Sequence, residues 1–178
     1  MISKSPSGGR RSAILTNVGI CLPFPLITGE TIEKEVQQFI GVWDTGATNT
    51  VISKKIVDAV GLKPTGQTKV NTPAGDDYQN TYLVNLTLPM GFMFPNLMVT
   101  EGKMAGVDAL IGMDIICLGD FSITNLIGNT VMNFRIPSMI EYDYVTDGNR
   151  YNAIQVRRMT APSNPQRRQP QKKRKHKT

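Results

Sequence analysis

The chain has 178 residues, 40% of them hydrophobic, and a formal net charge of +6, which fits one domain with extensions and a small core. No stretch is apolar enough to cross a membrane and no apolar segment follows the basic N-terminus, so we expect a cytoplasmic protein without a signal peptide. Two cysteines and a single histidine exclude a disulfide framework, histidine-rich zinc sites and histidine-dependent nucleophilic catalysis.

In chain order, the first predicted elements are a basic arm, two strands and a helix. Residues 1–12 are rich in serine, glycine and basic residues, which is typical of a disordered arm. Apolar runs predict strands over residues 13–22 and 35–43. Residues 54–60 predict a helix that begins after Ser53 as its N-cap.

The middle of the chain predicts a hairpin and a further strand. Residues 68–71 and 78–88 are strand-like, and they flank a solvated turn at residues 72–77. Residues 92–100 form another apolar stretch, in which Pro95 indicates an edge or a bulge.

The last predicted elements are a buried strand, a short helix and a hairpin. Residues 107–111 are short and apolar, and residues 113–118 predict a short helix. Residues 121–125 and 130–136 predict a hairpin around the turn at 127–129. Many short strands with frequent turns favour an all-β, closed or sandwich-like domain with one or two short helices.

One motif stands directly after the second predicted strand: Asp44, Thr45, Gly46 and Ala47. Gly46 lets the backbone turn sharply without a side chain that would block the carboxylate, and Thr45 adds a short hydroxyl that can hold the loop. An aspartate that merely closes a turn is the plainer interpretation. The residues around the motif favour a chemical role for Asp44.

Those residues resemble the retropepsin-type aspartic proteases, closest to the small single-lobe bacterial members. The resemblance is carried by Trp43-Asp44-Thr45-Gly46-Ala47-Thr48-Asn49-Thr50-Val51-Ile52 and by Leu110-Ile111-Gly112-Met113-Asp114-Ile115-Ile116. Gly112 lies 68 residues after Asp44, which leaves room for one flap hairpin and two or three strands. The resemblance covers about residues 13–137 and implies an all-β fold, a closed barrel-like lobe with one or two short helices.

A single Asp-Thr-Gly implies two chains. Peptide hydrolysis by carboxylates needs one ionised group that takes a proton from water and one protonated group that donates to the substrate carbonyl. Two close carboxyls achieve this because they titrate as a pair. We therefore expect an aspartic endopeptidase that acts as a homodimer on protein or peptide substrates, with Asp44 of each chain at the two-fold axis and no cofactor or metal.

The resemblance also assigns roles to residues of this sequence. It implies a catalytic motif at Asp44, Thr45 and Gly46. It implies that the motif is backed by Leu110, Ile111 and Gly112. Substrate contacts are expected from the loop and from the flap tip, at Ala47, Thr48, Asn49, Thr72, Pro73, Ala74 and Gly75.

Two positions depart from the viral pattern. Viral members usually have an acidic residue or serine at the position of Thr48 and an arginine at the position of Met113, so the ion pair that braces viral dimers is absent here. The viral flap is rich in glycine, whereas this one has Gly75 alone beside Asp76 and Asp77. The geometry of the dimer and the motion of the flap are therefore not inferred from the viral members.

Two other functions compete with proteolysis. A non-catalytic module with the same fold could bind peptides or nucleic acid. The run from Asp44 to Thr50 also resembles the phosphate-gripping hairpin of sugar kinases in the actin-like group. That fold needs a duplicated, far longer chain and a strand where residues 54–60 predict a helix.

Residues 138–158 form an extension, and residues 159–178 are expected to be a disordered basic tail. Residues 150–178 hold ten positive charges and no acid, whereas residues 13–149 have a net charge of −7. The tail fits contact with RNA, DNA or another polyanion through Lys172, Lys173, Arg174 and Lys175. A solubilising extension or a tether to the acidic domain would explain it equally. No aromatic residue interleaves the tail's basic residues, which argues against base stacking there.

Overall fold

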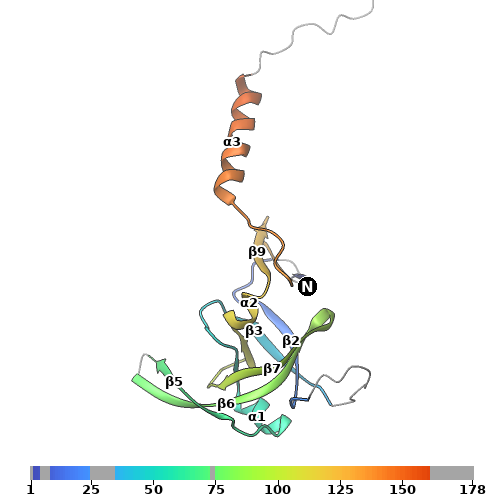
Figure 1. Ribbon diagram of the computed structural model, residues 1–178. Coiled ribbons are helices and arrows are strands. Elements are labelled where there is room, and N and C mark those ends of the chain that lie inside the picture. The colour runs from blue at the N-terminus through green and yellow to red at the C-terminus, as the bar shows by residue number, and fades with distance from the viewer. Residues whose placement is uncertain (1, 5–8, 25–34, 73–74, 161–178) are drawn as a thin grey trace, which may run out of the picture. The chain divides into compact units, whose positions relative to one another are not determined.

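The computed structural model of the chain describes residues 2–4, 9–24, 35–72 and 75–160. The chain divides into two compact units, Met1–Ile140 and Glu141–Thr178. Figure 1 labels helices and strands of both units. Within the described residues, no helix is both long and apolar enough to cross a membrane.

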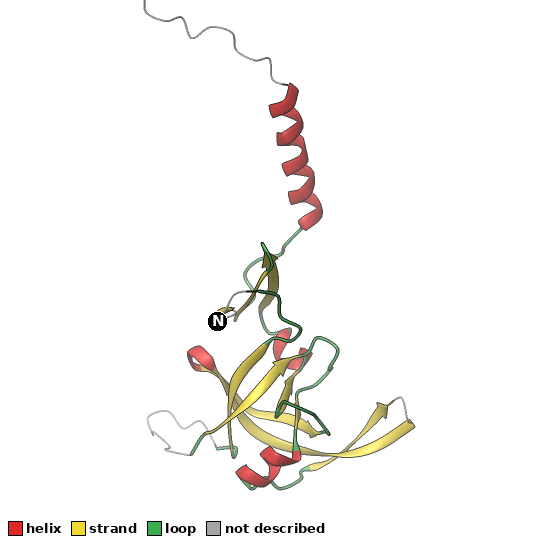
Figure 2. Cartoon of the chain, turned by 180° about the vertical axis from the view of Figure 1, so that it is seen from behind, coloured by secondary structure: helices red, strands yellow, loops and turns green. Residues whose placement is uncertain are grey.

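Six strands of the first unit close into a barrel. Around the sheet they are β2 (Leu15–Cys21), β3 (Gln37–Trp43), β8 (Ala109–Ile111), β4 (Val51–Ile52), β7 (Phe92–Glu101) and β6 (Gly75–Leu88). Pairing of β2 with β6, with Gly19 opposite Thr87, closes the ring. Figure 2 shows these strands in yellow. The prediction of an all-β, closed retropepsin-like lobe is confirmed.

The core lies inside this barrel and is made of side chains from alternate strand positions, as the two-residue period of a strand requires. Fully buried members come from five different strands: Ile20, Ile52, Val84, Val99 and Ile111. Trp43, at the end of β3, stacks on Phe121 with ring centroids 5.4 Å apart and packs against Phe134 at 4.8 Å. This aromatic cluster joins the barrel to the hairpin that follows it in sequence.

Two short helices flank the barrel, as predicted. The first, α1 (Lys54–Val60), ends at Gly61, whose φ of 71° is the left-handed cap conformation that favours glycine. Ser53 stands at its N-cap position, but its side chain makes no capping hydrogen bond. The second, α2 (Met113–Ile116), is shorter than predicted. A 3-10 turn, η1 (Pro89–Gly91), connects β6 to β7.

The predicted flap hairpin exists, but its turn is shorter than expected. β5 (Gly66–Thr72) pairs with β6 up to the rung that joins Thr72 and Gly75, and the hairpin projects from the barrel (Figure 2). Asp76 and Asp77 therefore lie in β6, opposite Asn71 and Val70. Their assignment to a solvated turn was wrong, because the strand pairing continues as far as the two-residue connection.

The bulge that Pro95 indicated is confirmed. Val84 pairs with Leu97 and Leu86 pairs with Phe94, so two residues of β7 face the single Asn85 of β6. The side-chain oxygen of buried Asn85 accepts a hydrogen bond from the backbone N–H of Asn96 at 2.8 Å, which satisfies a group that the bulge removes from the ladder.

A second, three-stranded sheet contains β1 (Ile2–Lys4), β10 (Asn129–Arg135) and β9 (Asp120–Leu126). The hairpin of β9 and β10 agrees with its prediction, with Ile127 and Gly128 at φ of 51° and 76° in its turn. The structure differs from the expected arm at residues 1–12, because Ile2–Lys4 form a strand that pairs with β10. Local composition does not reveal a partner so distant in sequence.

The second unit contains a helix, α3 (Tyr144–Thr160), where we expected only an extension and the start of the tail. The unit boundary also changes the charge balance. Residues 1–140 carry ten positive charges and eleven acids, whereas residues 141–178 carry ten positive charges and three acids. The first unit is therefore close to neutral, and the basic character belongs to the second.

The hydrogen bonds to Asp120, at the base of the β9–β10 hairpin, predict how the stability of the fold depends on pH. The Ser138 hydroxyl, the Met139 N–H and the Arg135 guanidinium lower the pKa of the Asp120 carboxyl to about 2. Its pKa in an unfolded chain is about 3.9, so its contribution to stability is complete above that value and is lost as the pH falls through about 2. We expect Asp120→Asn to lower the melting temperature at pH 6 and to have a much smaller effect near pH 2. Melting curves from pH 2 to 7 measure this.

The control is Asp58→Asn, which removes only an exposed ion pair with Lys54 and should change the melting temperature little at any pH. An Asp120→Asn effect that persists undiminished at pH 2 would contradict the assignment.

Candidate active site

Asp44 is placed by the pairing of two strands that are far apart in sequence. β3 runs parallel to β8, with Trp43 opposite Ile111. The backbone N–H of Asp44 donates to the carbonyl of Ile111 at 3.0 Å, which extends this ladder by one residue into the loop. Leu110 and Ile111, which the resemblance expects behind the motif, lie in β8, the strand that pairs with β3.

The carboxylate of Asp44 is held by its own turn. The backbone N–H of Gly46 donates to Asp44 Oδ1 at 2.8 Å, and the N–H of Ala47 donates to the Asp44 carbonyl at 3.3 Å. A β-carbon on Gly46 would lie 3.2 Å from Asp44 Oδ1, so a glycine at this position leaves the carboxylate uncrowded. Asp44 is partly exposed, and the hydrogen bond to its Oδ1 lies at the surface.

The rest of the loop is attached to the start of α2. The backbone N–H groups of Met113 and Asp114 donate to the carbonyls of Ala47 and Thr48 at 2.8 and 3.1 Å. At Gly112 the two backbones touch, because a β-carbon there would lie 2.5 Å from the carbonyl carbon of Asn49. This contact explains why the apolar pair before α2 is followed by a glycine.

A buried hydroxyl completes the attachment. Thr50 is fully buried; its Oγ1 donates to Asp114 Oδ1 at 2.8 Å and accepts from the N–H of Gly112 at 3.2 Å. Its backbone N–H donates to Asp114 Oδ2 at 2.9 Å. We call Thr50, Gly112 and Asp114 the loop clamp. It fixes the Asp44 loop against α2 with both oxygens of one carboxylate.

The sequence analysis missed the clamp. Asp114 does lie in the first turn of α2, as a residue favoured by the helix dipole would, but its carboxylate also binds the active-site loop. The available signal was a polar residue, Thr50, at the point where an apolar strand begins. Its partner is 64 residues away, so the sequence alone could not identify it.

The remaining predicted site residues lie in two places. Thr45, Thr48 and Asn49 are exposed on the loop. Thr72 and Gly75 form the last rung of the flap hairpin. Pro73 and Ala74 lie outside the described residues, as do Lys172, Lys173, Arg174 and Lys175 of the tail.

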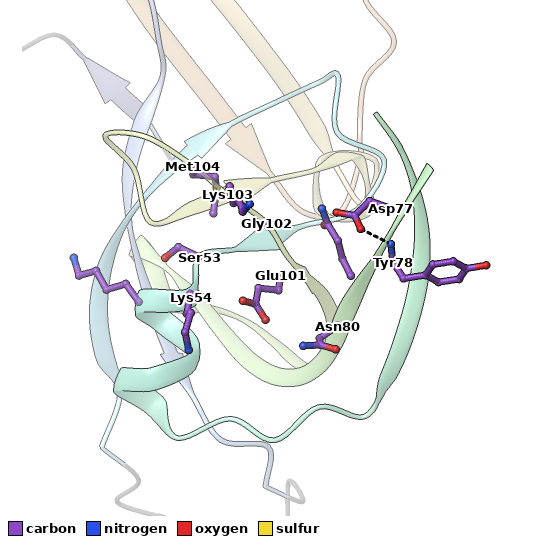
Figure 3. Close-up of a pocket in the computed structure, with 11 residues that line it drawn as sticks. Ser53, Lys54, Asp77, Tyr78, Asn80, Glu101, Gly102, Lys103 and Met104 are labelled. Carbon is purple, nitrogen blue, oxygen red and sulfur yellow. Dashed lines mark hydrogen bonds between the residues drawn. The ribbon is translucent and has the colours of Figure 1, made fainter. Parts of the chain in front are cut away.

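A groove of about 910 Å³ lies beside the base of the flap and does not include Asp44. It is lined by three segments, Ser53–Lys55 at the start of α1, Asp77–Asn80 of β6 and Glu101–Met104 after β7. Figure 3 shows Glu101 and Asn80 facing its interior, whereas the Tyr78 ring points away. The hydroxyl of buried Tyr82 donates to Glu101 Oε2 at 2.7 Å, so Glu101 also ties β7 to the flap strand.

Two lysines at the groove form ion pairs. Lys54 Nζ contacts Asp58 at 2.7 Å, and Lys55 Nζ contacts Asp108 at 2.9 Å. The ion pair with Lys55 and a hydrogen bond from the N–H of Ile40 outweigh partial burial and lower the pKa of the Asp108 carboxyl. Across the described part of the chain, no three His, Cys, Asp or Glu side chains gather into a metal site.

Loss of the loop clamp should destabilise the fold, whereas a matching change at the neighbouring Thr48 should not. Thr50→Val leaves Asp114 Oδ1 and the Gly112 N–H without their partner, which costs about 1–3 kcal/mol in the free energy of unfolding. Thr48→Val is the matched control because Thr48 is exposed, and it should change this free energy by less than about 0.5 kcal/mol. Urea unfolding of both variants measures the difference. Equal effects would show that the clamp does not stabilise the loop.

The chain is similar to known proteins. Residues 31–117 match the family model described as gag-polyprotein putative aspartyl protease. Among curated proteins, no significant match is found. Among solved structures, the chain is similar to a retropepsin-like aspartic protease from Rickettsia conorii, with 14% identity over 76% of this chain and 94% of that one and a TM-score of 0.46.

Two further solved structures are similar at this level. One is the foamy viral protease-reverse transcriptase in complex with an RNA/DNA hybrid, at 16% identity over 77% of this chain and 14% of that one, with a TM-score of 0.40. The other is the retroviral protease-like domain of Ddi1 from Leishmania major, at 17% identity over 72% and 97%, with a TM-score of 0.38. The family match spans the Asp44 loop, the flap hairpin and Gly112, and together with the closed barrel it supports a retropepsin-like aspartic protease.

Proposed function

We propose that the protein is an aspartic endopeptidase whose active form is a homodimer with one Asp44 from each chain. The observation that carries this proposal is the setting of Asp44: a partly exposed aspartate in a Thr-Gly turn, fixed by β8 on one side and by the loop clamp on the other. A catalytic carboxylate needs a fixed position relative to the bond that it attacks, and this setting would supply it.

The chemistry needs a pair of carboxyls. One Asp44 carboxylate accepts a proton from a water molecule, which attacks the scissile carbonyl carbon, while the protonated partner donates to the carbonyl oxygen. Two carboxyls close together hold one proton between them because both cannot ionise in a shared site. The sequence contains one Asp-Thr-Gly, so the second carboxyl comes from a second copy.

A two-fold axis beside Asp44 is the simplest arrangement. Thr45 is exposed next to Asp44, which suits contact with its counterpart across the axis. Met113 stands where viral relatives carry an arginine, and here the loop is braced inside one chain by Asp114. The dimer therefore does not depend on an ion pair at this position to hold its loops.

The substrate is an extended peptide that lies between the loop and the flap. Ala47, Thr48 and Asn49 supply contacts from the loop, and the flap tip at residues 72–75 supplies contacts from the other side. Closure of the flap excludes bulk water from the carboxyl pair. Lys172, Lys173, Arg174 and Lys175 remain proposed contacts for a polyanion, and a cytoplasmic location remains a prediction from the sequence.

The first test replaces the Asp44 carboxylate with an amide of nearly the same size. Asp44→Asn should reduce cleavage of a denatured-protein or peptide library at pH 4–6 by about 10²–10⁴-fold or more, because the acid–base pair is lost. Cleavage by the unmodified chain should be suppressed by pepstatin-like inhibitors. Asp58→Asn, at an exposed helix position, is the control and should retain activity. A chain that cleaves nothing would favour the non-catalytic binding module, and cleavage undiminished by Asp44→Asn would show that Asp44 is not the catalytic residue.

The second test asks whether one active site uses the Asp44 residues of two chains. Unmodified chains mixed with a fourfold excess of Asp44→Asn chains and allowed to exchange should lose about four-fifths of their activity, because random pairing places most active chains in dimers with one carboxylate. The same excess of Asp58→Asn chains should not reduce activity. Activity that follows only the amount of unmodified chain would contradict a dyad shared between copies.

A further inference from the structure

The second unit contains a helix that buries nothing. None of the residues of α3 is buried, and Tyr144 and Tyr151 are 68% and 63% exposed. The unit Glu141–Thr178 carries ten positive charges against three acids. A helix that forms no core but keeps aromatic side chains in solvent presents a surface whose function lies outside the unit.

The helix has a defined start. Asp143 accepts hydrogen bonds from the N–H groups of Val145 and Thr146, both at 3.0 Å, and from the Thr146 hydroxyl at 2.5 Å. The Thr146 hydroxyl and N–H lower the pKa of the Asp143 carboxyl, so it caps the helix as an anion. The cap fixes where α3 begins.

The charges of α3 lie on one side. At roughly 100° per residue, an arc of roughly 140° contains all of its charged residues and both of its tyrosines. This basic aromatic face consists of Tyr144, Asp147, Arg150, Tyr151, Ile154, Arg157 and Arg158. The opposite side carries no charge, and its only apolar side chains larger than alanine are Val145, Val156 and Met159.

We propose that the basic aromatic face of α3 binds single-stranded nucleic acid. Arg150, Arg157 and Arg158 would contact phosphates, and Tyr144 and Tyr151, which are two turns apart, would stack on bases. Tyr142 extends the aromatic surface, because its ring stacks on that of Tyr144 at a centroid distance of 5.8 Å and an interplanar angle of 5°. The basic residues that follow Thr160 in the sequence would add sequence-independent charge.

Two features favour this ligand over other polyanions. Exposed rings gain by stacking only where bases are unpaired, so the face favours single strands over duplex. The uncharged side of α3 is too poor in large apolar residues to insert into a lipid surface, which a membrane-bound amphipathic helix requires. The proposal is independent of the proteolytic function, since none of its residues belongs to the Asp44 site.

The test uses the full chain and fluorescence anisotropy with a labelled 20-nucleotide single-stranded oligo-U, an RNA duplex of the same length, and vesicles of phosphatidylserine and phosphatidylcholine. Tyr144→Leu/Tyr151→Leu keeps a good helix former at both positions but removes the rings. It should weaken single-strand binding at least about fivefold and leave duplex binding unchanged. The matched control, Tyr144→Phe/Tyr151→Phe, keeps the rings and should bind as the unmodified chain does.

The charge contribution is measured separately. Arg150→Gln/Arg157→Gln/Arg158→Gln should reduce the slope of log affinity against log salt by about 2 for the single strand. Circular dichroism of each variant confirms that α3 is retained. Single-strand affinity unchanged in the Leu variant would overturn the proposal, as would tighter binding to duplex or to the vesicles than to the single strand.

Discussion

The active-site loop depends on the close contact between two segments of backbone, Asn49–Thr50 and Gly112. No side chain separates them, since a β-carbon on Gly112 would lie 2.5 and 2.6 Å from the carbonyl carbon and oxygen of Asn49. The contact brings the N–H of Gly112 within reach of the Thr50 hydroxyl and the Asp114 carboxylate within reach of Thr50. Replacement of the glycine by any other residue would separate the segments and break all of these bonds together.

This arrangement has a consequence for assembly. In the proposed dimer each Asp44 loop would already be fixed within its own chain, so a second copy would not have to order it on binding, and the entropy cost of association would be correspondingly smaller. An interchain ion pair would contribute both order and affinity. Without one, the loop clamp would supply the order of the loop, and the affinity of the proposed dimer would have to come from other contacts between the chains.

Local signals in the sequence were sufficient for much of the fold. The Asp44 turn, the helix end at Gly61 and the bulge at Pro95 each follow from the conformational limits of one or two residues. Two failures depended on distant partners. Ile2–Lys4 pair with a strand about 130 residues away, and Thr50 and Asp114 are 64 residues apart. The assignment of Asp76 to a turn failed for a local reason, because the strand pairing continues up to the rung between Thr72 and Gly75. Helix α3 was missed for another reason: its faces differ in charge more than in hydrophobicity, so the apolar periodicity that predicts helices is weak.

The division into units changes how the charge of the chain should be interpreted. Counted over residues 13–149, the domain is strongly acidic and a natural counterpart for its own basic tail. However, Glu141, Asp143 and Asp147 belong to the second unit, and the positive charges of Lys4, Arg10 and Arg11 belong to the first. The remaining lobe is almost neutral, so its attraction for the tail is weak at physiological salt, where the screening length is about 8 Å. A self-tether therefore loses its main electrostatic argument, whereas a net basic unit with an exposed aromatic helix keeps its attraction for an external polyanion.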